Sequence, residues 1–90
     1  MATKRNQAII YRDVPGFLRR LREDAGLTQR ELAAKVNQTQ WWVYRGETGS
    51  RRVDVAEFCQ WCAGCGIEPA AAIRELGHAT QTGAEGDNNV

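Results

Sequence analysis

The segment Leu27–Gly49, LTQRELAAKVNQTQWWVYRGETG, constrains the fold more than any other part of the chain. Thr28 is a good N-cap residue, and Glu31 follows three positions later, which is the capping-box pattern that begins a helix. Three apolar residues then recur at helical spacing and give this helix one apolar face: Leu32, Ala33 and Val36. The segment therefore predicts a short helix that begins next to Thr28.

A second short helix is predicted directly after the first. Asn37 tolerates the positive φ with which a helix ends abruptly. Thr39 can cap the next helix, which is expected to stop near Gly49. Its clear apolar residue is Val43, and the other faces carry polar, flat or bidentate side chains that suit base-edge reading in a DNA major groove: Gln40, Trp41, Tyr44 and Arg45.

This pair of helices resembles the helix-turn-helix of the lambda-repressor/Cro-like (XRE) family of DNA-binding domains. The similarity extends over residues 14–76 and spreads over five helical segments, which makes it more specific than a bare motif. It implies an all-α, compact bundle of five short helices, with the helix-turn-helix in helices two and three. The residues within the motif that carry it are Leu27, Thr28, Gln29, Glu31, Leu32, Ala33, Lys35, Gln40, Val43, Glu47 and Gly49.

The resemblance places the base-contacting positions at Gln40, Trp41 and Arg45. Gln40 suits the N6 and N7 atoms of adenine, and Arg45 suits O6 and N7 of guanine. Trp41 departs from the small or polar residue usual there; its indole can pack on a thymine methyl group or on sugar edges but makes no bidentate bond. Trp42 is expected to be a packing residue.

Phosphate contacts are expected on both sides of the reading helix. The resemblance implies that Gln29 contacts a phosphate and braces Gln40, and the N-terminus of a helix favours anions in any case. The loop after the reading helix offers hydroxyl and guanidinium groups, although two neighbouring arginines can also be a solvated pair. The predicted phosphate-contacting residues are Gln29, Thr39, Tyr44, Ser50, Arg51 and Arg52.

Two further features concern how the reading helix is held. The resemblance implies an ion pair between Arg22 and Glu47 that pins the first helix to the third. Gly46 stands where the family usually has a large aliphatic residue, so the core has a gap at this point. Either Trp42 or Trp61 is expected to fill the gap.

The charges are unevenly distributed along the chain. Residues 1–52 carry 11 of the 12 Lys and Arg and 5 of the 11 Asp and Glu, a net charge of +6. Residues 53–90 have a net charge of −5. The basic half contains the candidate reading helix, which is the pattern expected for a protein that binds a polyanion. The alternative is that these charges only solvate the surface.

Helical signals continue on both sides of the motif. Asp13 can cap a first helix, with Pro15 just inside it and a core face of Phe17, Leu18 and Leu21. Asp54 and Glu57 form a second capping box, and the helix that follows has a predicted apolar face of Val55, Phe58, Cys62 and Cys65. A fifth helix begins at Pro69, with Ile73 and Leu76 as its apolar contacts and a surface available for a dimer.

The three cysteines, Cys59, Cys62 and Cys65, form C-x2-C-x2-C and have to be compared with metal motifs. The ferredoxin pattern has a further cysteine before a proline, which is missing here. Positions i, i+3 and i+6 also drift around a helix and do not converge on one ion. We therefore interpret them as small, partly buried apolar residues and predict no metal and no cofactor.

These signals divide the chain into three parts. Residues 1–12 are expected to be a basic, partly ordered arm that follows DNA, or else a frayed terminus. Residues 13–77 form the helix-turn-helix domain, and the Gly- and Ala-rich residues 78–90 are expected to be a disordered tail. Neither a membrane span nor a signal peptide is apparent, so a cytoplasmic location is expected.

The sequence thus predicts a transcriptional regulator, and the resemblance implies one of the phage-repressor or operon-autoregulating type. It is expected to bind double-stranded DNA at a palindromic operator as a homodimer, with residues 39–47 in the major groove and no small-molecule ligand. The alternative is a protein-interaction module that uses the Trp-rich face, because exposed Trp and Arg are also common at protein interfaces. No arrangement of catalytic side chains indicates an enzyme.

Overall fold

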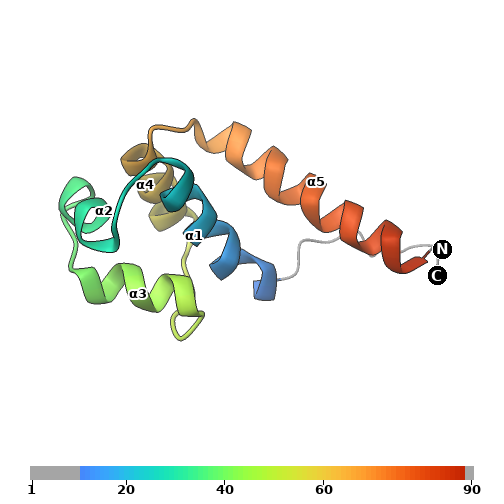
Figure 1. The fold of residues 1–90 in the computed structure, drawn as a ribbon, viewed down its shortest axis with the longest axis horizontal. Helices are drawn as coiled ribbons and strands as arrows, with labels where there is room; N and C mark the ends of the chain where they lie inside the picture. The colour runs from blue at the N-terminus through green and yellow to red at the C-terminus, as the bar shows by residue number, and fades with distance from the viewer. Residues whose placement is uncertain (1–10, 89–90) are drawn as a thin grey trace.

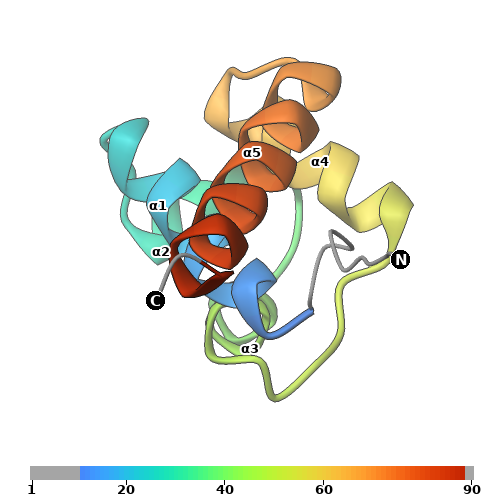
Figure 2. The same ribbon diagram turned by 90° about the vertical axis from the view of Figure 1, so that its right-hand side faces the viewer.

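The computed structural model describes residues 11–88, and in this range the chain is helical without strands. A short 3-10 helix leads into five α-helices, in agreement with the predicted all-α bundle. Figures 1 and 2 show α3 at one end of the bundle and the start of α5 at the other. The elements are η2 (Tyr11–Asp13), α1 (Val14–Asp24), α2 (Gln29–Lys35), α3 (Gln40–Thr48), α4 (Val55–Cys65) and α5 (Pro69–Asn88).

The predicted capping boxes are confirmed. The Thr28 hydroxyl accepts a hydrogen bond from the Glu31 N–H at 3.0 Å, and the Glu31 carboxylate accepts one from the Thr28 N–H at 2.8 Å. Asp54 and Glu57 make the same reciprocal pair at the start of α4. Each box satisfies two N–H groups that the first turn of a helix otherwise leaves unpaired.

The start of α1 differs from the prediction. Asp13 stands at its N-cap position but makes no capping hydrogen bond through its side chain. The reason is the 3-10 turn Tyr11–Asp13, which puts Asp13 in a helical conformation (φ −86°, ψ −15°) rather than the extended one that a capping side chain needs. Tyr11, assigned from the sequence to the N-terminal arm, is part of the folded domain, whereas residues 1–10 of the arm lie outside the described residues.

The turn between α2 and α3 depends on one asparagine. Asn37 has φ 58° and is the non-glycine residue with a positive φ in the described part of the chain. The short polar side chain of asparagine tolerates this left-handed conformation better than most residues do. Thr39 then caps α3 by accepting a hydrogen bond from the N–H of Trp42 at 3.0 Å. This tight turn fixes the direction in which α3 leaves α2.

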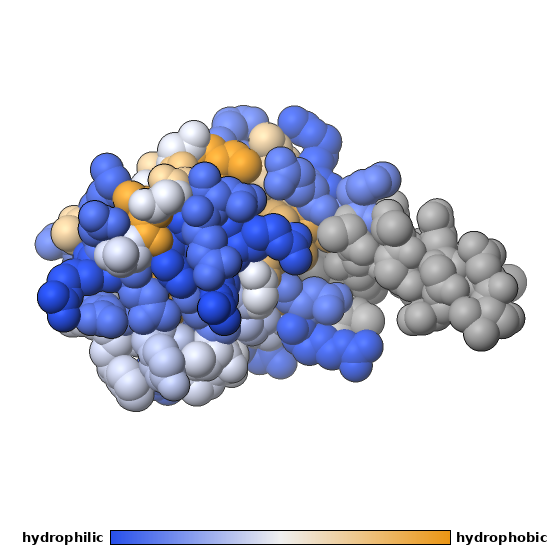
Figure 3. Space-filling model, viewed as in Figure 1, coloured by the Kyte–Doolittle hydropathy of each residue, from blue (hydrophilic) through white to orange (hydrophobic). Residues whose placement is uncertain are grey.

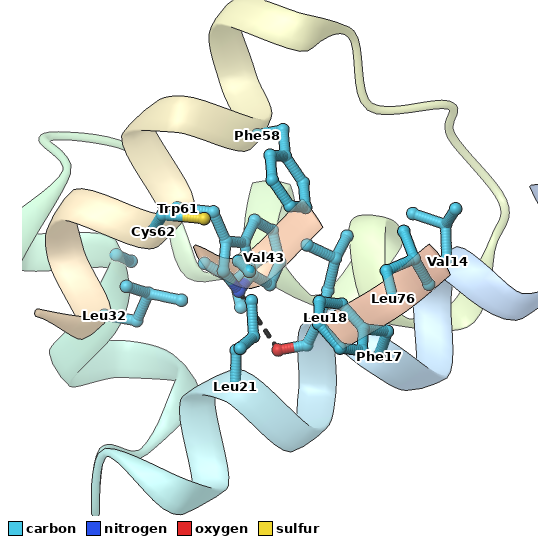
Figure 4. Packing of buried hydrophobic residues seen from close by; sticks show 12 residues of the cluster. Val14, Phe17, Leu18, Leu21, Leu32, Val43, Phe58, Trp61, Cys62 and Leu76 are labelled. Atoms are coloured by element: carbon cyan, nitrogen blue, oxygen red, sulfur yellow. Dashed lines mark hydrogen bonds between the residues drawn. The ribbon is translucent and has the colours of Figure 1, made fainter. Parts of the chain in front are cut away.

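The core lies between the five α-helices and is centred on Trp61 (Figure 4). The Trp61 side chain is completely buried, and its indole N–H donates to the carbonyl oxygen of Leu18 at 3.1 Å. A buried indole needs such a partner, because an unpaired N–H in an apolar environment is destabilising. The residues that form the core are Val14, Phe17, Leu18, Leu21, Leu32, Ala33, Val43, Phe58, Trp61, Cys62, Ala72 and Leu76.

The gap at Gly46 is filled by Trp61, one of the two tryptophans considered from the sequence. A Cβ atom placed on Gly46 would lie 2.9 Å from Cζ3 and 3.1 Å from Cη2 of the Trp61 indole. Trp42 is the neighbouring ring, with its centroid 5.4 Å from that of Trp61. A large residue supplied by α4 therefore replaces the large residue that the family usually has on α3.

Three predicted apolar contacts are wrong. Val55 is 80% exposed and Ile73 is 46% exposed, and Cys59 is exposed as well. Val55 is the first residue of α4 and projects before the packed part of the helix begins. On α5, the buried positions are Ala72 and Leu76, which lie four residues apart on one side of the helix.

The fifth helix is longer than predicted. It continues to Asn88, so residues 78–88 are helical where a disordered tail was expected, and residues 89–90 lie outside the described part. No proline follows Pro69, and the glycines at 77, 83 and 86 each weaken a helix by about 1 kcal/mol without blocking its hydrogen bonds. Composition alone is therefore a poor guide to where this helix ends.

The thiols of α4 are expected to differ in reactivity. Burial is the main cause that raises the pKa of Cys62 to about 11 and the pKa of Cys65 to about 11. Cys59, in contrast, is exposed. Since the thiolate is the reactive form, iodoacetamide at pH 8 should label Cys59 first, with the other two labelled only on unfolding. Mass spectrometry of timed digests measures this order.

The same shifts predict how stability depends on pH. Because the pKa of each buried thiol is higher in the folded state, its contribution to the free energy of unfolding is fully present below the ordinary pKa of 9.0. It is lost as the pH rises from 9 to about 11, because the unfolded chain releases these protons more readily. Urea unfolding of the Cys62→Ala variant should show a weaker loss over this range than the wild type; an unchanged loss would contradict this assignment.

Candidate nucleic-acid interface

α3 has a buried side and an exposed side. Val43 is completely buried and Gly46 faces Trp61, so these two positions attach the helix to the bundle. On the other side Gln40 is exposed, Trp41 is 62% exposed and Tyr44 is 44% exposed. Figure 3 shows a pale surface of intermediate hydropathy at the lower edge, where α3 lies in Figure 1, with hydrophilic surface above it. Of the predicted reading side chains, Gln40 and Trp41 are thus exposed on the side of α3 away from the core, and Arg45 is half-buried.

The ion pair between Arg22 and Glu47 is present. Nε and Nη2 of Arg22 donate to the two carboxylate oxygens of Glu47 at 2.6 and 3.0 Å. The side chains are only 11% and 3% exposed, and Arg22 also donates to the carbonyl oxygen of Leu27 at 2.8 Å. The hydrogen bond to Glu47 raises the pKa of Arg22, against the opposing effect of burial. This fork joins α1 to the last turn of α3 and fixes the rotation of α3 about its axis.

A chain of hydrogen bonds runs from this ion pair to the exposed start of α3. The Gln29 amide nitrogen donates to Oε1 of Glu47 at 3.1 Å, and the Gln29 amide oxygen accepts from Nε2 of Gln40 at 3.4 Å. The bracing of Gln40 by Gln29 that the resemblance implied is therefore seen. It restricts the Gln40 side chain before any ligand binds, which lowers the entropic cost of an ordered contact.

Trp41, Tyr44 and Arg45 form one connected surface. The rings of Trp41 and Tyr44 are stacked, with centroids 5.3 Å apart and an angle of 18° between their planes. The guanidinium carbon of Arg45 lies 5.9 Å from the centroid of the Trp41 ring, within the range of a cation–π contact. An apolar plate and a fixed cation therefore stand side by side on the exposed face of α3.

The loop after α3 holds Arg45 from the other side. Nε of Arg45 donates to the Ser50 hydroxyl at 3.4 Å and Nη2 donates to the Ser50 carbonyl oxygen at 3.2 Å. The Ser50 hydroxyl also lies 3.2 Å from that of Thr48. Ser50, predicted from the sequence to contact phosphate, thus also orients the arginine that is predicted to read a base.

The two loop arginines have different surroundings. Nη1 of Arg51 donates to Glu57 at 2.9 Å, Nη2 donates to the Trp42 carbonyl oxygen, and the guanidinium lies 4.8 Å from the Trp42 ring centroid. Arg51 therefore links the loop to α4 as a structural group. Arg52 is exposed, and its guanidinium lies over the Tyr11 ring at 4.3 Å.

Sequence reasoning missed the part that Tyr11 plays. Its hydroxyl accepts a hydrogen bond from the Val53 N–H at 2.6 Å, and its ring lies beneath Arg52. Tyr11 therefore ties the start of the domain to the loop that follows α3. In the sequence, Tyr11 stands out only as an aromatic residue next to two isoleucines and several basic residues. The segment has no helical periodicity that would assign Tyr11 to the folded domain.

Among residues 11–88, no three His, Cys, Asp or Glu side chains are grouped so that they could hold an ion. In the same range, no helix has both the length and the apolar character that crossing a membrane requires.

Comparison with known proteins shows to which family this chain belongs. The profile of a family described as a helix-turn-helix domain matches residues 16–76 of the chain. An XRE-family like protein from Pseudomonas syringae pv. tomato has 38% sequence identity to it and a TM-score of 0.71, covering 78% of this chain and 85% of that protein. The chain belongs to the XRE family of helix-turn-helix proteins. The resemblance noted from the sequence is thereby confirmed.

Two further solved structures share the fold at lower identity. The clp gene regulator ClgR from C. glutamicum is 25% identical, with a TM-score of 0.67 over 74% of this chain and 87% of that one. A mutant of the restriction-modification controller protein C.Esp1396I is 22% identical, with a TM-score of 0.68 over 71% and 85% of the two chains. A comparison with curated protein sequences gives no match.

Proposed function

We propose that this XRE-family chain is a transcriptional regulator that binds double-stranded DNA in a sequence-specific manner, with α3 in the major groove. The observation that carries the proposal is the exposed face of α3, on which Gln40 and Arg45 are each held by a neighbouring residue while the helix itself is fixed to α1. Side chains that are ordered before binding, on a helix of the right width, suit the reading of base edges.

The charge distribution supports the same partner. The positive half of the chain contains α1, α2 and α3 together with the loop that bears Arg51 and Arg52, whereas the negative half contains α4 and α5. The proposed base-contacting residues are Gln40, Trp41 and Arg45. The proposed phosphate-contacting residues are Gln29, Thr39, Tyr44, Ser50 and Arg52, with Arg51 in a structural role.

The regulator is further proposed to act as a homodimer on a palindromic site, of the phage-repressor or operon-autoregulating type. One module of this size offers few base contacts, and two-fold pairing doubles them. The names of the structural neighbours, a clp gene regulator and a restriction-modification controller, are consistent with such a role.

Selection of bound oligonucleotides from a random duplex pool tests these proposals together. A preferred motif with two inverted half-sites about one helical turn apart, roughly 10 base pairs, is expected from a dimer. Failure to enrich any motif at low salt would refute sequence-specific DNA binding. Affinity that barely changes between 50 and 200 mM salt would instead indicate a protein partner, because counterion release makes DNA binding strongly salt-dependent.

The residues proposed to read bases should affect specificity as well as affinity. Gln40→Ala and Arg45→Ala are each expected to weaken binding to the preferred site by about 1–3 kcal/mol and to abolish the preference at one base pair. Fluorescence anisotropy with the preferred duplex and its single-base variants measures both effects. Equal loss on all duplexes would show that the residue does not read a base.

Arg52 should behave differently from the reading residues. Arg52→Ala is expected to weaken binding to all duplexes alike and to reduce the slope of log K against log salt by about 1. The matched control is Arg74→Ala, another exposed arginine, in the second turn of α5. Figures 1 and 2 show the start of α5 at the opposite end of the bundle from α3. Loss confined to one duplex would contradict a phosphate contact.

A further inference from the structure

We propose that Trp41 and Arg45 together recognise a guanine whose neighbouring base is a pyrimidine with a C5 methyl group. This inference rests on the proposed DNA binding. Thymine and 5-methylcytosine both carry this methyl group at the same place in the major groove, and unmethylated cytosine lacks it. The site would therefore accept a guanine next to thymine, or a methylated C–G step, in preference to the unmethylated step.

The guanine is assigned to Arg45. Two of its nitrogen atoms are held by Ser50 at 3.4 and 3.2 Å, and Nη1 makes no hydrogen bond within the part of the chain that the structure describes. The guanidinium is thereby oriented at the C-terminal end of the exposed face of α3. Guanine presents two acceptors, O6 and N7, which arginine contacts more often than any other base edge.

The methyl group is assigned to Trp41. Its ring is 62% exposed and is kept in plane by stacking on Tyr44, and together with Gln40 the two aromatic residues line an open hollow of about 430 Å³. An indole face offers no bidentate hydrogen bond, so it discriminates only through apolar contact. The apolar group that base pairs present in the major groove is the C5 methyl of thymine, which 5-methylcytosine shares.

The two assignments fall on adjacent base pairs. The Arg45 guanidinium carbon lies 5.9 Å from the centre of the Trp41 ring, which is less than two base-pair rises of about 3.4 Å. A base bound to Arg45 therefore leaves the Trp41 ring over its neighbour. The cation–π contact between the two side chains keeps this spacing before DNA arrives.

The experiment changes one methyl group at a time. The guanine is identified in the selected motif as the position at which Arg45→Ala loses its preference. The pyrimidine beside it, on either side, is then supplied as thymine or deoxyuridine and as 5-methylcytosine or cytosine, at constant salt. We expect the methylated member of each pair to bind about three- to fivefold tighter, the gain for burying one methyl group.

Two variants make the result specific to Trp41. In Trp41→Ala the members of each pair should bind equally, and in Trp41→Phe, which keeps a flat apolar ring, the preference should persist. Because Trp41 is exposed, both variants should keep the wild-type circular dichroism spectrum and melting temperature.

Several outcomes would overturn the inference. They are a wild-type protein indifferent to the methyl group, a preference that survives in Trp41→Ala, and a selected motif with no pyrimidine beside the guanine. Each of these leaves sequence-specific DNA binding intact. If no duplex is selected at all, the proposed function itself fails, so the two failures are distinguishable.

Discussion

Glu47→Ala should lower the free energy of unfolding by about 3–5 kcal/mol, although Glu47 contributes nothing to the apolar core. The substitution leaves the guanidinium of Arg22, only 11% exposed, without a counterion and with the Leu27 carbonyl oxygen as its remaining partner. It also removes the acceptor for Gln29. Because the whole free energy of unfolding of a domain of this size is about 5–10 kcal/mol, urea unfolding should show the loss as a large fall in the midpoint.

The chain supplies its own control for this experiment. Arg19 and Glu23 also form an ion pair, at 3.0 Å, but their side chains are 63% and 50% exposed. Glu23→Ala should therefore cost about 0.5 kcal/mol or less, since water screens an exposed pair and solvates the remaining charge. Similar losses for the two variants would show that burial of the Arg22–Glu47 pair is not what makes it important.

The double variant Arg22→Leu, Glu47→Leu separates stability from orientation. Removing both charges avoids an unpaired buried charge, so much of the stability should return. The fixed rotation of α3 is lost together with the ion pair, so DNA affinity should remain low. Recovery of both properties would show that α3 is oriented by packing alone.

The sequence was informative where a local pattern determines a local structure. The capping residues Thr28, Thr39 and Asp54 all make the predicted hydrogen bonds, because a cap depends only on residues three positions away. Asn37 adopts the predicted left-handed conformation for the same reason. These few residues define α2, the turn and α3, and with them the direction in which the reading side chains project.

Apart from the Asp13 cap and the end of α5, the sequence was least informative where distant parts of the chain meet. The periodicity of α4 indicates Val55 as an apolar contact, but Val55 is 80% exposed in the structure. Arg51 and Arg52 cannot be told apart by sequence, yet Glu57 and Trp42 surround one and Tyr11 the other. The Arg22–Glu47 pair, 25 positions apart, was expected only because the family resemblance implied it.

The largest departure from the family pattern is Gly46, whose missing side chain is replaced by the indole of Trp61. Trp61→Ala should cost about 3–5 kcal/mol, the usual loss for truncating a buried tryptophan. The completely buried indole fills the space in front of Gly46 and donates to the Leu18 carbonyl oxygen, so its removal leaves a cavity and takes one buried hydrogen bond away. Urea unfolding compares it with Trp41→Ala, which removes an exposed indole and should change stability by less than about 1 kcal/mol.

Gly46 and Trp61 should also be strongly coupled. In the wild type, Gly46→Ala should destabilise by about 1–3 kcal/mol despite the better helix propensity of alanine, because its Cβ would lie 2.9 Å from the rigid indole. In a Trp61→Leu background the obstructing ring atoms are gone, and the same substitution should stabilise by up to about 1 kcal/mol. A double-mutant cycle measures this reversal of sign. Additive effects would mean that the two residues do not share one space, and that Gly46 is required for another reason.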